Sequence, residues 1–199
     1  MTPLILASGS PRRRRLLEFL GVAFQVCPAE IEEVPAPGES PEVFVRRAAR
    51  EKALEVARTE HGAAVLGADT IVELDGAILG KPASNEEAGS MLRALSGREH
   101  KVHTAIALAL DGTCHDLVDT TRVRFLDLND RIIRWYVATG EPRDKAGAYA
   151  VQGLGGLMVA GIEGSPHTVV GLPIQRLAEL FETCGLDFWS LIPSGGQLT

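Results

Sequence analysis

Residues 65–82 read VLGADTIVELDGAILGKP and decide the fold, because two apolar runs flank the turn pair Asp75-Gly76. Asp-Gly between apolar runs is a strong signal for a two-residue β-hairpin. Asp69 lies inside the first apolar run, and Lys81 follows the second. A buried carboxylate is costly unless it is paired, hydrogen-bonded or bound to a metal. The hairpin predicts either a locally paired aspartate, which is the commoner case for a single residue, or a site that gathers charged ligands.

The composition predicts a globular protein with a real hydrophobic core. The chain has 199 residues, 45% of them apolar, which is enough for one large domain or two small lobes. A net charge of −6 argues against nucleic-acid binding but leaves room for a small anionic substrate. Three widely spaced cysteines without zinc-ligand spacing favour reduced thiols in a cytoplasmic protein. We expect no signal peptide and no association with a membrane, because no apolar run is long enough.

The N-terminal segment predicts a phosphate-binding loop between a strand at residues 4–7 and a helix that begins at Pro11 and ends near Gly21. Four arginines occupy the first turn of this helix. The positive helix end disfavours each cation there by about 0.3–1 kcal/mol. Arginines beside backbone N–H groups and serine hydroxyls therefore favour a bound anion such as phosphate. The predicted site residues are Ser8, Ser10, Arg12 and Arg13, whereas Arg14 and Arg15 are predicted to be solvated.

Three further segments offer polar groups that are compatible with either a functional or a purely structural role. The acidic run at residues 29–33 suits a hard cation such as Mg2+, but read locally it is a solvated loop. Lys52 lies beside a stripe of small residues on a helix predicted from Pro41 to about residue 59, and a single helix lysine is most often solvated. The glycine-rich run at residues 140–156 lacks the spacings of known nucleotide-binding loops. Its Gln152 can both donate and accept, which suits the edge of a pyrimidine base.

Five segments in order then resemble the motifs of the Maf family of nucleoside triphosphate pyrophosphatases. They are LASGSPRR at 6–13, AREKA at 49–53, GADT with GKP at 67–82, DKAGAY with VQG at 144–153, and GSPHTVVGLP at 164–173. The resemblance implies an α/β fold: a mixed, twisted sheet with flanking helices, in two lobes around a central cleft. It implies a single catalytic domain over residues 1–185. Residues 186–199, which contain the run PSGG at 193–196, are predicted to form a loose C-terminal tail.

The resemblance also implies roles for single residues. Asp69 would accept the proton of the attacking water, and Glu33 with Asp69 would hold a divalent cation, Mg2+ or Mn2+. Lys52 and Lys81 would act at the phosphates. Arg13, Thr70 and Gln152 match the branch that hydrolyses dTTP and UTP, whereas the 7-methyl-GTP branch typically has Glu at the position of Thr70. The expected products are the nucleoside monophosphate and diphosphate.

Several alternatives stay open from the sequence. Modified pyrimidine triphosphates are further candidate substrates, and a 7-methyl-GTP-type or broad specificity is a second hypothesis. A third hypothesis is a nucleotide-binding regulator of cell division and septum formation without catalysis, although the intact Asp69 and Lys81 favour an enzyme. The resemblance is compatible with a homodimer and with nucleotide-pool house-cleaning in the cytoplasm.

Overall fold

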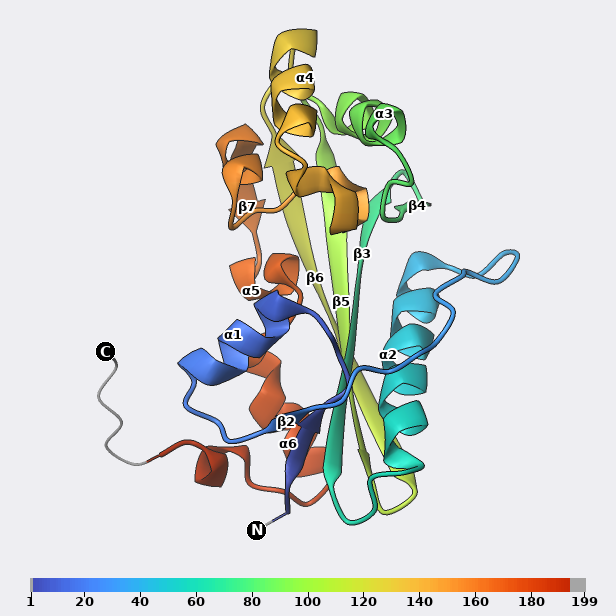
Figure 1. Ribbon diagram of the computed structural model, residues 1–199, viewed down its shortest axis with the longest axis vertical. Coiled ribbons are helices and arrows are strands. Elements are labelled where there is room, and N and C mark those ends of the chain that lie inside the picture. Colours follow the sequence, from blue (N-terminus) through green and yellow to red (C-terminus); the bar gives the residue numbers. More distant parts are fainter. Residues whose placement is uncertain (1, 194–199) are drawn as a thin grey trace. The chain divides into compact units, whose positions relative to one another are not determined.

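The computed structural model describes residues 2–193 (Figure 1). The strands are β1 (Leu4–Leu6), β2 (Gln25–Val26), β3 (Ala64–Leu74), β4 (Ala77–Leu79), β5 (Glu99–Leu110), β6 (Thr113–Phe125) and β7 (Val159–Glu163). The α-helices are α1 (Pro11–Phe19), α2 (Pro41–Ala57), α3 (Asn85–Leu95), α4 (Asp130–Ala138), α5 (Pro166–Val170) and α6 (Leu177–Thr183). Short 3-10 helices cover Glu141–Asp144, Ala146–Ala148, Leu154–Met158, Ile174–Arg176 and Phe188–Leu191. No described helix is long and apolar enough to cross a membrane.

The strands form one mixed sheet in the order β2-β1-β3-β5-β6-β7, with β4 paired to β3. Strand β1 runs parallel to both β2 and β3. The pairs β3–β4 and β6–β7 are antiparallel. The predicted α/β class, with a mixed sheet and flanking helices, is therefore confirmed.

The predicted Asp75-Gly76 hairpin is present, a second Asp-Gly turn joins β5 to β6, and both turns follow from local chemistry. Asp75 and Gly76 have φ of 52° and 83°, and Asp111 and Gly112 have φ of 48° and 81°. Positive φ at both central residues is the type I′ turn, whose twist matches that of the flanking strands. Strand β3 is almost entirely buried, whereas β4 is half-buried or exposed. The first hairpin is thus buried mainly on its Asp69 strand.

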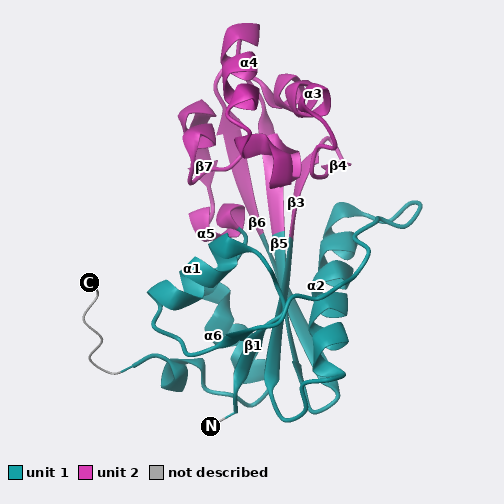
Figure 2. Ribbon diagram, viewed as in Figure 1, with its two compact units in different colours: residues 1–69, 104–119, 171–199 teal, residues 70–103, 120–170 magenta. Residues whose placement is uncertain are grey.

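The chain divides into two compact units, each assembled from separate segments (Figure 2). Unit 1 comprises residues 1–69, 104–119 and 171–199, and unit 2 comprises residues 70–103 and 120–170. Strands β3, β5 and β6 contribute residues to both units. Whether the two units act as one catalytic domain stays a prediction.

Unit 1 buries apolar side chains from its strands and from three helices. Figure 1 shows α2 on one side of the strands and α1 and α6 on the other. The helix α1 buries Leu16 and Leu17, while Leu20 is only half-buried. Helix α2 begins at the predicted cap, where Ser40 Oγ accepts a hydrogen bond from Val43 N at 3.4 Å.

The C-terminal part of unit 1 differs from the prediction of a loose tail. Phe188 is buried, and its ring lies 5.0 Å from that of Phe181 in an edge-to-face contact. Asp187 caps the 3-10 helix Phe188–Leu191 by accepting from Trp189 N. The chain is therefore packed through residue 191, and the rest of the predicted tail, residues 194–199, lies outside the described residues.

Unit 2 has its own core, in which α3 and α4 contact each other. The core members are Val72, Leu74, Ala88, Leu92, Leu95, Val102, Val123, Phe125, Ile133, Tyr136, Ala148, Tyr149 and Met158. His100 is 2% exposed among them, and its Nε2 lies 2.8 Å from Tyr149 Oη. His103, three residues further along β5, has different partners: its Nε2 lies 2.6 Å from Glu73 Oε2 and its Nδ1 lies 2.8 Å from Thr120 Oγ1.

Candidate active site

The parallel pairing of β1 with β3 brings the N-terminal loop to Asp69. Leu6 is in register with Leu66, and Ala7 N donates to Leu66 O. The pairing of β1 with β3 ends at Leu6 and Leu66. The loop that follows β1 and the part of β3 that follows Leu66 therefore extend from the same end of this pairing. Ser8 and Asp69 come from these two segments, and both are buried.

Close packing of α2 on β3 brings Lys52 to the same place. A Cβ at Gly67 would lie 2.3 Å from Ala49 O and 2.7 Å from Ala53 N, so only glycine fits against the α2 backbone here. Lys52 lies between these two alanines on α2. The stripe of small residues seen in the sequence is thus the surface of α2 that packs closely against β3.

Lys52 joins two carboxylates of unit 1. Its Nζ lies 2.6 Å from Asp69 Oδ1 and 2.9 Å from Glu33 Oε1. Lys52 and Asp69 are 6% and 4% exposed, whereas the Glu33 side chain is 36% exposed. Read locally, the sequence favoured a solvated lysine, and this reading is wrong because Lys52 is buried. The acidic loop is exposed at Glu30, Glu32 and Glu33, as that reading expected, and Glu33 also pairs with Lys52. The buried carboxylate predicted from the hairpin is paired, as its burial requires.

The predicted phosphate loop is built on a buried arginine. Arg13 Nη1 donates to Ser8 Oγ at 2.9 Å, and Arg13 Nε donates to Gly171 O at 2.8 Å. Ser10 N also donates to Ser8 Oγ, at 3.3 Å. Desolvation lowers the pKa of Arg13, and the nearby charges of Asp69 and Glu33 oppose this shift. The loop and the carboxylates therefore belong to one electrostatic cluster of unit 1.

Two details of this loop correct the sequence reading. Ser10 stands at the N-cap position of α1, but its side chain makes no capping hydrogen bond. Arg14 is exposed, as predicted, but it pairs with Glu18 at 2.7 Å instead of being simply solvated. Arg15 is exposed, as predicted, and Arg12 is half-buried, so its place in the site stays a prediction.

The donor set suits a hard divalent cation. Mg2+ prefers oxygen ligands and is commonly held by one or two carboxylates together with substrate phosphates. Asp69 and Glu33 both reach the same ammonium, so their carboxylates converge on one point. The described residues contain no cluster of three or more His, Cys, Asp or Glu that would hold a metal ion without substrate. Asp69 and Glu33 are therefore the residues that would hold the cation.

The remaining predicted residues belong to unit 2. Thr70 is half-buried in β3, Lys81 is exposed beyond β4, and Gln152 is exposed in the glycine-rich run. Asp144 and Lys145, also in this run, form an ion pair with each other. Sequence reasoning assigned nothing to Glu141, whose carboxylate accepts backbone N–H bonds from the same run. Such contacts leave no pattern in the sequence.

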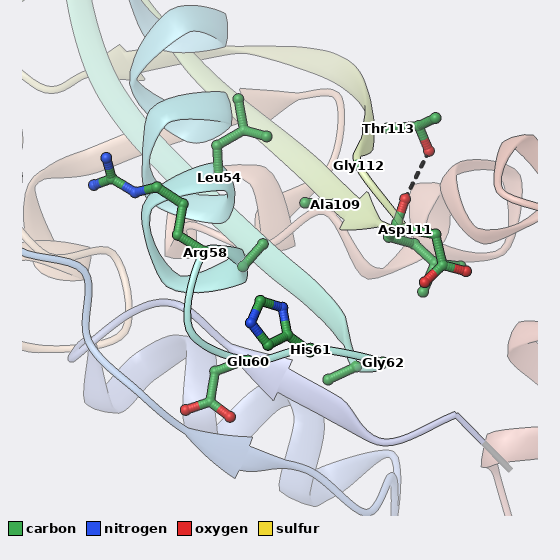
Figure 3. A pocket seen from close by; sticks show the side chains of 12 residues that line it. Leu54, Arg58, Glu60, His61, Gly62, Ala109, Asp111, Gly112 and Thr113 are labelled. Carbon is green, nitrogen blue, oxygen red and sulfur yellow. Dashed lines mark hydrogen bonds between the residues drawn. The ribbon is translucent and has the colours of Figure 1, made fainter.

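A cavity of about 420 Å³ also lies in unit 1, between the C-terminal end of α2 and the turn that joins β5 to β6 (Figure 3). Its charged lining comes from Arg58, Glu60, His61 and Asp111. None of the predicted site residues lines this cavity. It is therefore separate from the group of Lys52, Asp69, Glu33, Ser8 and Arg13, called the Lys52 cluster below.

Comparison with known proteins shows the family of this chain. A sequence profile described as "Maf-like protein" matches residues 3–184. A protein of Myxococcus xanthus named dTTP/UTP pyrophosphatase is 53% identical over 186 residues, covering 93% of this chain and 94% of the relative. Proteins with the same name from Escherichia coli and Nitratidesulfovibrio vulgaris are 54% and 51% identical, covering 90% and 89% of this chain and 92% and 86% of the relatives. The chain therefore belongs to the Maf family.

Proposed function

We propose that this protein is a nucleoside triphosphate pyrophosphatase that hydrolyses dTTP and UTP to the monophosphate and diphosphate. Relatives at about half identity carry the name of this activity. The observation that carries the proposal is the buried Lys52, held between Asp69 and Glu33 next to the Ser8–Arg13 loop. Phosphoanhydride cleavage needs a base for water and cations around the departing charge, and this cluster offers both.

The products define the chemistry. The bond between the α- and β-phosphates breaks, and the oxygen of water forms the new bond to phosphorus. Asp69 takes the proton from this water, and diphosphate leaves with the electron pair of the broken bond. A bound Mg2+ or Mn2+ would neutralise phosphate charge. Lys52 compensates the charge of Asp69 in its buried position and so keeps the base in place.

The other predicted residues bind the nucleotide. We assign the triphosphate to Ser8, Ser10, Arg12 and Arg13, with Lys52 and Lys81 as further cations. Arg13 is fixed by Ser8 and Gly171, so its guanidinium does not have to be ordered when substrate binds. We assign recognition of the pyrimidine to Thr70 and Gln152.

Diphosphate release from dTTP, UTP, CTP, GTP and 7-methyl-GTP, with and without Mg2+, tests this function. We expect metal-dependent release with kcat/KM for dTTP and UTP about tenfold or more above the others, the discrimination of one or two hydrogen bonds. A preference for 7-methyl-GTP would refute the assigned specificity. Binding without release from any nucleotide would refute the enzymatic function.

Two wider expectations stay predictions from the resemblance. One is a cytoplasmic house-cleaning role on non-standard pyrimidine triphosphates, which turnover of modified dUTP analogues would test. The other is a homodimer, which light scattering of the purified protein would test.

A further inference from the structure

A polar pair in unit 2 has no part in the roles assigned above. Tyr136 of α4 donates from Oη to Glu141 Oε1 at 2.7 Å. Thr139 Oγ1 donates to Tyr136 O, and Glu141 N donates to Thr139 Oγ1. The end of α4 therefore fixes both the backbone and the carboxylate of Glu141.

This pair binds the backbone on both sides of Gln152. Ala150 N, two residues before Gln152, donates to Tyr136 Oη at 3.1 Å. Leu154 N and Gly155 N, two and three residues after it, donate to Glu141 Oε2 and Oε1 at 3.0 Å each. Between these anchors Gly153 N donates to Ala150 O at 3.2 Å and closes a turn. The exposed Gln152 thus lies in a turn whose two ends are held by one side-chain pair.

Two glycines of this run, Gly153 and Gly155, are explained by the same contact. A Cβ at Gly153 would lie 2.4 Å from Glu141 Oε2, and a Cβ at Gly155 would lie 2.7 Å from Tyr136 Oη. The backbone approaches the pair too closely for any side chain at these two positions. These two glycines therefore serve close packing on Glu141 and Tyr136.

Glu141 is suited to binding these backbone N–H groups because its carboxylate is an anion. Partial burial raises the pKa of its carboxyl, but hydrogen bonds from Gly155, Tyr136 and Leu154 and the charge of Lys145 outweigh that effect, so the pKa is lowered overall. Bonds from N–H groups to a charged acceptor are stronger than those to a neutral one.

We propose that Glu141, together with Tyr136, is a positioning residue that holds Gln152 ready to meet the pyrimidine; this rests on the proposed function of Gln152. A preformed turn removes the cost of ordering the glycine-rich run when nucleotide binds. Loss of Glu141 therefore affects nucleotide recognition more than the chemical step.

Steady-state kinetics of Glu141→Gln on UTP, dTTP and CTP tests this. We expect KM for UTP to rise roughly tenfold and kcat to stay within about twofold, because a neutral amide turns one N–H donor toward the N–H groups of the turn. The preference for UTP over CTP falls with it. Glu163→Gln is the matched control, since Glu163 is exposed and pairs with Arg122 instead. A lowered kcat with unchanged KM, or an unchanged UTP preference, would overturn the proposal.

A double-variant cycle with Gln152→Ala shows whether Glu141 acts through Gln152. If it does, Glu141→Gln costs little further affinity once Gln152 has been removed. Additive losses in Glu141→Gln/Gln152→Ala would show that Glu141 acts by another route and would contradict the inference.

Amide hydrogen exchange supplies a readout that needs no turnover. The amides of Leu154 and Gly155 should exchange about tenfold faster or more in Glu141→Gln than in the wild type, with protection in the α3 and α4 helices unchanged. Equal exchange in the two proteins would refute the positioning role, whereas a wild type without turnover would refute the proposed function. If Glu141→Gln does not fold, Tyr136→Phe replaces it, with the Ala150 amide as the reporter.

Discussion

Replacing Gly67 with Ala should move Lys52 away from Asp69. The added Cβ would lie 2.3 Å from Ala49 O and 2.7 Å from Ala53 N, two backbone atoms of α2 that cannot rotate aside. Ordinary contact begins at 3.4 Å, so α2 must retreat from β3 by roughly 1 Å. Lys52 lies on the same turn of α2, and its bond to Asp69 is 2.6 Å long. A retreat of that size breaks the bond.

The expected magnitudes follow from that displacement. Overpacking costs about 1–3 kcal/mol of unfolding free energy. In a chain of 199 residues this lowers Tm by roughly 2–12 °C. A misplacement of about 1 Å near reacting groups can cost about 10²-fold in rate, so we expect kcat/KM for UTP to fall by that factor.

Diphosphate release and thermal unfolding monitored by circular dichroism measure the two effects. Gly161→Ala in β7 is the matched control, because its Cβ meets nothing nearer than Arg124 Nη2 at 3.8 Å. The control should match the wild type in both measurements. Wild-type kcat/KM and Tm in Gly67→Ala would refute the reasoning that α2–β3 packing sets the position of Lys52.

Three further predictions concern the base, the metal and pH. Asp69→Asn should lower kcat about 10²–10⁴-fold, the usual worth of a general base, while calorimetry still detects UTP binding. Chelation by EDTA should abolish diphosphate release, and added Mg2+ or Mn2+ should restore it, because the carboxylates of Glu33 and Asp69 converge on one point and suit a hard cation. Release that survives EDTA would contradict this. Burial lowers the pKa of His100 to about 4, whereas the unfolded chain takes up this proton near pH 6.5. Stability is therefore lost as pH falls from 6.5 towards 4, by roughly 3 kcal/mol at most, and His100→Gln should flatten that part of the Tm–pH curve.

Local chemistry made much of the fold predictable. Both Asp-Gly turns and the caps at Ser40 and Ser84 depend on neighbours within four residues, and all four are present. The apolar spacing of residues 173–183 suggests one continuous helix, but a 3-10 turn, Ile174–Arg176, precedes α6. The packing of the C-terminal segment was missed because its glycine and proline content indicates a loose chain. The contact between Phe188 and Phe181 that holds it is a tertiary contact and is not visible in the sequence.

The site was predictable as a set of residues but not as a geometry. Asp69 stood out because a carboxylate inside an apolar strand requires a partner. Its partner Lys52 looks solvated in sequence, since only the approach of α2 to Gly67 makes the contact. Glu141 was invisible, because the groups it binds are backbone N–H groups that every residue but proline carries.

The discontinuity of unit 1 has a consequence for synthesis on the ribosome. Lys52 and Asp69 are translated early, but the same unit also buries Leu177, Leu180 and Phe181 from the last segment of the chain. At about 5–20 residues per second, the stretch of about 100 residues between Asp69 and Gly171 takes roughly 5–20 s to translate. During that interval the nascent chain exposes apolar strands that lack their covering helix. Chains that terminate before α6 should therefore be substrates for chaperones and proteases, even though every residue of the Lys52 cluster has already been made.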